Sequence, residues 1–182
     1  MHSIRIIGAG SIGNHLANAA RSFGWQVILT DNDPAALERA RTSIYPLRYG
    51  AWDNAIVLKD SRAAMTEPAD VVFVGTPPDS HIAIANTVLD HATPKALIIE
   101  KPLAGPDLAG CAELQARVKK AGIFAGVGYN HTLGQNTLAA EDLLKAGKLG
   151  PMSPLSARPR EHWGGFLPAP PGHAGPADSY LG

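Results

Sequence analysis

The glycine-rich segment Gly8-Ala9-Gly10-Ser11-Ile12-Gly13 constrains the fold of this 182-residue chain more than any other feature, because of what flanks it. The run at residues 4–7 precedes it and has the look of a buried strand. Apolar residues at helical spacing follow, and a second apolar run ends at Asp31. Strand, glycine turn, helix, strand and acidic residue in this order predict a dinucleotide-binding unit.

Each position of the glycine segment has a distinct expected role. Gly8 permits the tight turn out of the strand, Gly10 lets the backbone approach a pyrophosphate, and Gly13 lets the helix pack close to the strand. Ser11 and Ile12 open the helix, whose first N–H groups would face the phosphates. The alternative is a glycine-rich turn in an α/β protein that binds nothing.

Asp31 is placed to accept hydrogen bonds from a ribose diol of the dinucleotide. A carboxylate there repels a 2′-phosphate, and no arginine follows Asp31 before Arg39. The sequence therefore predicts NAD as the cofactor, with NADP disfavoured.

Strand and helix patterns alternate along the chain, which predicts an α/β fold with a doubly wound, mostly parallel sheet of the Rossmann type. Strands are expected at 3–7, 25–30, 55–58, 70–75, 95–100 and 123–128. Helices are expected at 11–23, 34–43, 78–91, 105–121 and 135–146. Residues 1–130 are expected to form the dinucleotide-binding domain. Residues 131–182 would supply a linking helix and the short, Pro/Gly-rich start of an α+β second domain.

The last 32 residues contain seven prolines and five glycines, and only 155–158 has a strand pattern. This stretch cannot form a core alone, so it is either an arm on the sheet domain or the opening of a second domain. In the latter case its aromatic residues could be buried against another copy of the chain, which makes a homo-oligomer a possible assembly.

Composition narrows the function classes. Sixteen basic residues balance sixteen acidic ones, which argues against nucleic acid or an anionic membrane as partner. There is no membrane-length apolar run, no room for a signal peptide and no predicted metal site, so a cytoplasmic protein is expected. The one cysteine, Cys111, excludes a disulfide framework and shares a predicted helical face with Leu108, Leu114 and Val118, as expected of a core residue.

A second candidate segment follows the strand expected at 70–75. Thr76 and Pro77 are predicted to contact the nicotinamide half of the cofactor, because ligands bind at the carboxyl ends of strands in such sheets. Asp79 or Ser80 can cap the next helix. His81 lies in the first turn of that helix, and local hydrogen bonding and a role in the site are equally open to it.

Two further segments follow strands. In Glu100-Lys101-Pro102, the lysine stands between a strand end and a proline, and a neighbouring oxidised nicotinamide would favour loss of a proton from its amine. The second segment ends in Asn130, which can donate and accept, and His131, which could titrate near neutrality. The alternative for His131 is that it caps the following helix.

Together these segments resemble the Gfo/Idh/MocA family of sugar and inositol oxidoreductases. The resemblance implies that Glu100 and Lys101 contact the cofactor, that the bond before Pro102 is cis, and that Lys101 lies near the nicotinamide and the substrate hydroxyl. The catalytic candidates are Lys101, Asn130 and His131, and His81 is counted among the cofactor-binding residues. In the family a second domain usually adds an Asp-x-x-x-His pair, an arrangement that His162, Trp163, His173 and Asp178 do not form.

The expected function is hydride transfer between NAD and a secondary alcohol of a sugar, nucleotide-sugar or inositol-like substrate. A non-catalytic NAD-binding sensor or scaffold is one alternative, and a Rossmann-fold reductase acting on other substrates, such as amino-acid precursors, is another. The 182-residue chain alone is expected to bind cofactor and to turn over poorly.

Overall fold

The computed structural model describes residues 1–151. It divides into two compact units that begin at Met1 and at Tyr129, the first ending at Gly128. The strand expected at 155–158, and the tail residues considered for an Asp-x-x-x-His pair, lie outside the described residues.

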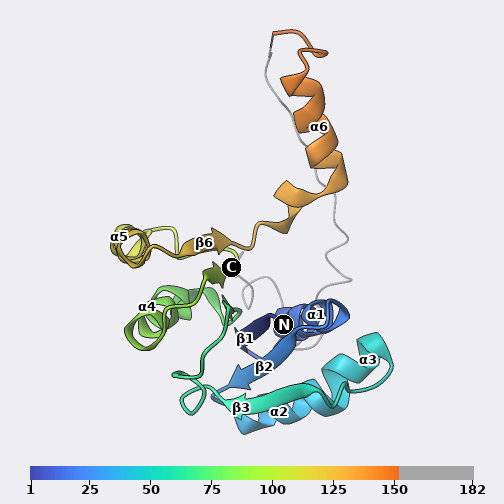
Figure 1. Cartoon of the computed structure of the whole chain (residues 1–182), viewed down its shortest axis with the longest axis vertical. Coiled ribbons are helices and arrows are strands. Elements are labelled where there is room, and N and C mark those ends of the chain that lie inside the picture. The colour runs from blue at the N-terminus through green and yellow to red at the C-terminus, as the bar shows by residue number, and fades with distance from the viewer. Residues whose placement is uncertain (152–182) are drawn as a thin grey trace. The chain divides into compact units, whose positions relative to one another are not determined.

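The first unit is built on a six-stranded sheet in which every neighbouring pair is parallel, as predicted (Figure 1). The strand order is β3-β2-β1-β4-β5-β6. β1 and β4 are therefore neighbours at the point where the strand order reverses, which is where doubly wound sheets bind ligands. The strands are β1 (Ser3–Ile7), β2 (Gln26–Asp31), β3 (Ile56–Asp60), β4 (Val71–Val74), β5 (Ala96–Ile99) and β6 (Phe124–Val127).

Helices connect the strands and cover both faces of the sheet. The α-helices are α1 (Ser11–Ser22), α2 (Pro34–Arg39), α3 (Tyr45–Tyr49), α4 (His81–His91), α5 (Cys111–Ala121) and, in the second unit, α6 (Gln135–Lys145). A π-helical segment, η1 (Ala40–Ile44), and two 3-10 turns, η2 (Pro78–Ser80) and η3 (Asn130–Leu133), complete the described elements.

Two apolar clusters hold the layers together, because alternate residues of each strand point to opposite faces. On one face Ile6 and Leu29 pack with Ala17 of α1 and with the region around α3. On the other, Val72 and Leu97 pack with residues of α4 and α5. β4 contributes Phe73 to the first cluster and Val72 and Val74 to the second, so this strand packs on both sides.

Two helix predictions need correction. The helix expected at 34–43 ends at Arg39, because the chain widens into η1 and continues as α3, which buries Ala40, Ile44 and Tyr45. The helix expected from residue 105 begins only at Cys111.

Positive φ angles at Leu108 and Gly110 keep the chain before α5 irregular. Leu108 is consequently 65% exposed and does not share a helical face with Cys111, although Leu114 is buried as expected. Cys111 itself is half-buried.

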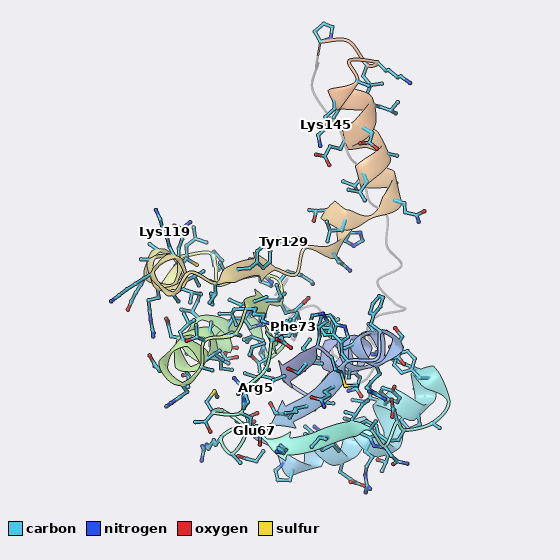
Figure 2. The ribbon with its side chains drawn as sticks, viewed as in Figure 1. Arg5, Glu67, Phe73, Lys119, Tyr129 and Lys145 are labelled. Atoms are coloured by element: carbon cyan, nitrogen blue, oxygen red, sulfur yellow. The ribbon has the colours of Figure 1, made fainter. Side chains whose placement is uncertain are left out.

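Arg5 is buried in the middle of β1, with 1% of its surface exposed (Figure 2). Its Nη1 donates to the carbonyl oxygens of Ala64, Met65 and Glu67 at 2.5, 2.6 and 2.8 Å. Burial lowers the pKa of the Arg5 guanidinium, an effect that the nearby Glu67 opposes. Arg5 thereby fastens the β3–β4 connection to the sheet, where doubly wound folds often place a helix.

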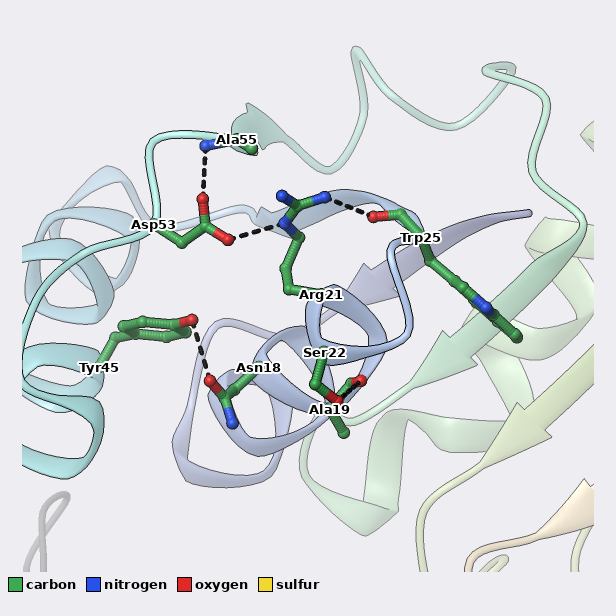
Figure 3. Close-up of polar contacts among 8 residues, drawn as sticks. All are labelled: Asn18, Ala19, Arg21, Ser22, Trp25, Tyr45, Asp53 and Ala55. Atoms are coloured by element: carbon green, nitrogen blue, oxygen red, sulfur yellow. Dashed lines mark hydrogen bonds and ion pairs between the residues drawn. The ribbon is translucent and has the colours of Figure 1, made fainter. Parts of the chain in front are cut away.

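α1 is tied to the neighbouring segments by a polar cluster (Figure 3). Arg21 Nε donates to Asp53 Oδ2 at 2.7 Å, and Arg21 Nη1 donates to the Trp25 carbonyl at 2.8 Å. The hydrogen bond from Arg21 lowers the pKa of the Asp53 carboxyl. Tyr45 of α3 donates to Asn18 of α1 at 3.1 Å, so the helix that follows the glycine segment is held on two sides.

Candidate cofactor and active site

The carboxyl ends of the strands bring three of the predicted segments to one edge of the sheet. The residue that follows each of β1, β4, β5 and β6 donates its backbone N–H to a carbonyl of the neighbouring strand at 2.8 Å; these residues are Gly8, Gly75, Glu100 and Gly128. The glycine segment, the segment after β4 and the segment after β5 therefore lie next to one another in space.

The three motif glycines differ in what surrounds them. A Cβ on Gly8, whose φ is +109°, would lie 2.6 Å from the Gly75 carbonyl oxygen, and one on Gly13 would lie 2.0 Å from the Gly8 oxygen. A Cβ on Gly10 would meet no atom within 4 Å. Gly8 and Gly13 are thus required by the packing of the protein itself, whereas Gly10 leaves a space open for a ligand.

The loop is held by side chains on both sides. Asn14, which is fully buried, donates through Nδ2 to the carbonyls of Ala9 and Gly10 at 2.9 and 2.8 Å. Asp31 Oδ2 accepts from the Ala9 N–H at 2.9 Å. Asn14 was not among the predicted site residues, although a polar residue on the buried face of α1, directly after Gly13, was a signal for it.

The first turn of α1 fits a pyrophosphate. The first N–H groups of an α-helix have no intrahelical partner, and no side chain caps α1 at its N-cap residue, Gly10. Arg48 of α3 donates to the Ser11 carbonyl and to Ser11 Oγ at 2.8 and 2.7 Å, which places a cation beside the same turn. Sequence reasoning missed Arg48, because only the tertiary fold brings α3 to the glycine segment.

Asp31 lines a cleft of about 380 Å³ beside the glycine segment. Its Oδ1 accepts from the Asp33 N–H at 3.0 Å, and each carboxylate oxygen can still accept a second hydrogen bond, as a ribose diol requires. The cleft is lined by Ile7, Gly8, Asp31, Asn32, Ser61, Arg62, Met65, Thr76, Pro77, Asp79, Ser80 and Ile84.

Arg62 brings a positive charge into this cleft that the sequence did not indicate. It follows β3, and β3 pairs with β2 so that Asp60 stands beside Asp31. Arg62 is the only cationic residue among those lining the cleft, where Asp31 and Asp79 supply two negative charges. The sequence-based prediction considered only the residues that directly follow Asp31, where the first arginine is Arg39, and so it did not include Arg62.

Residues after β4 form a compact turn at the far side of the same cleft. Ser80 Oγ donates to the Pro77 carbonyl at 2.7 Å and is hydrogen-bonded to Thr76 Oγ1 at 2.7 Å. Ser80 precedes α4, yet neither it nor Asp79 makes the expected capping bond, because the Ser80 hydroxyl is used within the turn. Thr76 and Pro77 themselves line the cleft, as a residue in contact with cofactor must.

His81 makes local hydrogen bonds, one of the two roles left open by the sequence. No part of its surface is exposed. Its Nε2 lies 2.7 Å from the Thr76 carbonyl oxygen, and its Nδ1 lies 2.9 Å from the Pro102 carbonyl oxygen.

The segment after β5 has the expected backbone, with a cis bond between Lys101 and Pro102. Burial raises the pKa of the Glu100 carboxyl, against smaller lowering effects from Lys101 and His81. A Cβ on Gly128 would lie 2.7 Å from Glu100 Oε2, so the glycine makes room for this carboxyl group.

The remaining catalytic candidates, Asn130 and His131, lie in η3 of the second unit. The His131 carbonyl accepts from Thr137 Oγ1 at 2.8 Å, and the N-cap of α6 is Gly134, so the side chain of His131 does not cap α6. Catalytic roles for Asn130 and His131 remain predictions.

Within residues 1–151 no group of three His, Cys, Asp or Glu side chains is arranged to hold a metal ion. Over the same residues, no helix has the length and apolarity needed to cross a membrane.

Residues 3–129 match the model of an oxidoreductase family described as having an NAD-binding Rossmann fold. The chain belongs to the Gfo/Idh/MocA family. This confirms the resemblance inferred from the glycine segment and the segments after β4 and β5, and with it the NAD-binding fold.

Individual proteins are also similar to this chain in sequence or in fold. The chain is 28% identical over 125 residues to the 1-carboxy-3-chloro-3,4-dihydroxycyclohexa-1,5-diene dehydrogenase of Comamonas testosteroni, covering 68% of this chain and 29% of that protein. An NAD binding oxidoreductase from Klebsiella pneumoniae superposes with a TM-score of 0.64 at 26% identity, over 82% of this chain and 40% of its own. The apo scyllo-inositol dehydrogenase of Lactobacillus casei has the same fold, with a TM-score of 0.64 at 22% identity over 82% and 43% of the two chains.

The chain thus spans under half the length of these relatives.

Proposed function

We propose that this chain is the NAD-binding part of an oxidoreductase that transfers hydride between NAD and a secondary alcohol on a substrate ring. The observation that carries the proposal is the open space at Gly10 on the same sheet edge as Lys101. The Gly75 N–H donates to the Ile7 carbonyl of β1, and the Glu100 N–H donates to the Val74 carbonyl of β4. The glycine segment with its open space at Gly10 and the segment with Lys101 therefore follow strands that are separated only by β4.

Each residue of the edge has a proposed part in holding the cofactor. The first turn of α1 and Arg48 would hold the pyrophosphate, Asp31 the adenosine ribose, and Thr76 with Pro77 the side of the cleft that leads toward the nicotinamide. Fixed N–H groups and charges of this kind bind without having to reorganise. The bound NAD supplies the hydride acceptor; the chain supplies placement and proton transfer.

Lys101 is proposed to act on the substrate hydroxyl. As the alcohol is oxidised, its O–H proton passes to the Lys101 amine while the C–H hydrogen leaves as hydride. The charge that the amine gains with this proton lies next to the substrate oxygen, and it stabilises the negative charge that develops there as the O–H bond breaks. Asn130 and His131, which follow β6 in sequence, are proposed as further catalytic residues, because an amide can donate and accept hydrogen bonds and an imidazole can exchange protons.

The substrate proposed is a polyhydroxylated ring, such as a sugar, a nucleotide sugar or an inositol. The name of the Comamonas relative describes a ring with two hydroxyl groups, and that of the Lactobacillus neighbour an inositol, so both carry hydroxyl groups on a six-carbon ring. These names support the class of substrate and not a particular compound.

The test combines binding with single-turnover chemistry. Calorimetry of the chain with NAD⁺ should show binding, and NADH fluorescence should report reduction when a panel of ring alcohols is added at high protein concentration. Lys101→Met should bind NAD⁺ normally and reduce none of it. Absence of NAD⁺ binding in the folded chain would refute the proposal. Binding without NADH formation, with every alcohol, would favour the non-catalytic sensor or scaffold instead.

A further inference from the structure

His81 connects two of the segments that carry the candidate site. It is the first residue of α4, and its ring lies between the Thr76 carbonyl, which follows β4, and the Pro102 carbonyl, which follows β5. The two ring nitrogens stand 2.7 and 2.9 Å from these oxygens. A single side chain thus bridges the loop that lines the cofactor cleft and the loop that contains Lys101.

The chemistry of the two partners restricts which nitrogens of the His81 ring donate a hydrogen bond. Both partners are carbonyl oxygens, which only accept, so each ring nitrogen must donate to make its bond. A neutral imidazole carries one N–H and would leave one contact unsatisfied, whereas the doubly protonated ring donates from both nitrogens. The half-buried Glu100 carboxyl interacts electrostatically with His81 and with Lys101.

No other side chain of similar size replaces this geometry. Asparagine and glutamine carry both of their donor hydrogens on one amide nitrogen, whereas the imidazole ring presents two separate nitrogens to carbonyls of two different loops. An amide nitrogen that replaces one ring nitrogen therefore leaves the other carbonyl without its partner. An unpaired buried carbonyl is unfavourable and would be relieved by movement of its loop. Replacing His81 by an amide side chain should therefore free either the Thr76 loop or the Pro102 loop from this contact.

We propose that His81 is a positioning residue, which fastens the Thr76 loop to the Pro102 loop and thereby sets where Lys101 stands relative to bound NAD. The inference rests on the proposed function, because it concerns the placement of Lys101 toward the cofactor. It assigns to His81 an indirect role, through the backbone of Thr76 and Pro102, in place of direct contact with the cofactor.

The test compares His81→Gln and His81→Asn with His91→Gln. His91 ends the same helix and is exposed, so the control makes the same change without touching either loop. Thermal melting establishes that each variant is folded. The readout is the rate at which acetic anhydride acylates Lys101, measured by peptide mass spectrometry with and without saturating NAD⁺, alongside the NAD⁺ affinity from calorimetry.

In the native chain and in His91→Gln, NAD⁺ should slow acylation of Lys101. In both His81 variants this protection should fall by about tenfold, the effect of one lost hydrogen bond that leaves its carbonyl unpaired. NAD⁺ should still bind, because Gly10, α1 and Asp31 are unchanged. Equal protection in a folded His81 variant and the native chain would overturn the inference while leaving the proposed function intact.

A measurement on the native chain keeps the inference testable if neither variant folds. Nitrogen-15 NMR of the His81 ring should show a hydrogen-bonded proton on each nitrogen. One proton only, with one nitrogen acting as an acceptor, would show that the two loops are not fastened together as proposed. If the native chain binds no NAD⁺ at all, both the proposed function and this role of His81 are refuted.

Discussion

Gly10 and Gly13 belong to the same loop, and the difference in the space around them leads to opposite predictions. Gly10→Val would place its side chain in the open space, so the protein should fold with an unchanged melting temperature. The same side chain would exclude the pyrophosphate, and NAD⁺ affinity should fall at least about tenfold, or ~1.4 kcal/mol. Calorimetry of the folded variant measures this, and an unchanged affinity would count against the site.

Gly13→Ala is the matched control. Its Cβ would lie 2.0 Å from the Gly8 carbonyl oxygen, so α1 and β1 must move apart. Overpacking of this kind destabilises by roughly 1–3 kcal/mol, and the melting temperature should fall. The two glycines therefore separate an effect on binding from an effect on folding.

Arg62 alters the argument for NAD over NADP without reversing it. Two carboxylates and one guanidinium line the cleft, so a 2′-phosphate there meets net negative charge. NADP⁺ should bind at least about tenfold more weakly than NAD⁺. Arg62→Ala should weaken NADP⁺ binding further than NAD⁺ binding, since it removes the only cation of the lining.

Arg41→Ala is the control for Arg62, because Arg41 is exposed and bonds to Glu38. It should leave both affinities as they are. Calorimetry with the two dinucleotides decides the point: NADP⁺ binding as tight as NAD⁺ in the native chain would show that Asp31 does not select between them.

Residues of the site differ in how far the sequence could predict them. Gly8, Gly10, Gly13 and Asp31 belong to a local motif whose spacing is itself the signal. Arg48 and Arg62 reach the same edge from distant parts of the chain, so only the tertiary fold reveals them. Arg5, in a run that reads as an apolar strand, is buried, and its Nη1 donates to three carbonyls of the β3–β4 connection, which the local sequence does not reveal.

At the scale of elements, Asp70 joins the amino ends of neighbouring strands. Its Oδ2 accepts from the N–H of Ser3 in β1 at 2.9 Å, and Lys95, which precedes β5, lies 2.7 Å from Oδ1. Lys95 and then Ser3 lower the pKa of the Asp70 carboxyl from 3.8 to about 2. A lowered pKa stabilises the folded state above pH 3.8, and this contribution is lost as the pH falls toward 2.

Asp70→Asn should therefore lower the free energy of unfolding at pH 7 and have a diminishing effect below pH 3.8. Urea titrations at a series of pH values measure the difference. A difference from the native chain that stays constant down to pH 2 would contradict the role of the carboxylate charge.

Glu100 gives the opposite dependence. Burial raises the pKa of its carboxyl above 4.5, so the folded state is favoured below that pH and the advantage is lost as the pH rises through the raised pKa. Glu100→Gln removes this half-buried charge. The variant should gain stability relative to the native chain between pH 4 and pH 7, and no gain over that range would show that the carboxylate is well solvated.

Elements were predictable where one local pattern determines them. Each of the six strands is a short apolar or mixed run, and the buried runs of β4 and β5 could be placed from their composition. The late start of α5 could not, because the left-handed backbone at Leu108 runs against the residue's own preference. The π segment after α2 likewise depends on burying Ile44 and Tyr45.

At the scale of the molecule, the 182-residue chain by itself should bind NAD⁺ and turn over poorly. Hydride transfer requires substrate held in a near-attack geometry and shielded from water, and such positioning can supply roughly 7–11 kcal/mol of the barrier. The described cleft is lined by residues of the first unit alone, and the dehydrogenase of Comamonas testosteroni shares only 29% of its length with this chain.

The measurement is steady-state NADH formation by the purified chain, with saturating NAD⁺ and with sugars and inositols as substrates. We expect slow steady-state turnover, with NADH formation detected only as single turnovers at high protein concentration. NAD⁺ affinity by calorimetry should be normal, because the proposed pyrophosphate and ribose contacts all come from the first unit. Sustained oxidation of any of these alcohols, abolished by Lys101→Met, would instead show that the chain contains a working substrate site. Lys101 would then need only the surroundings that this chain already provides.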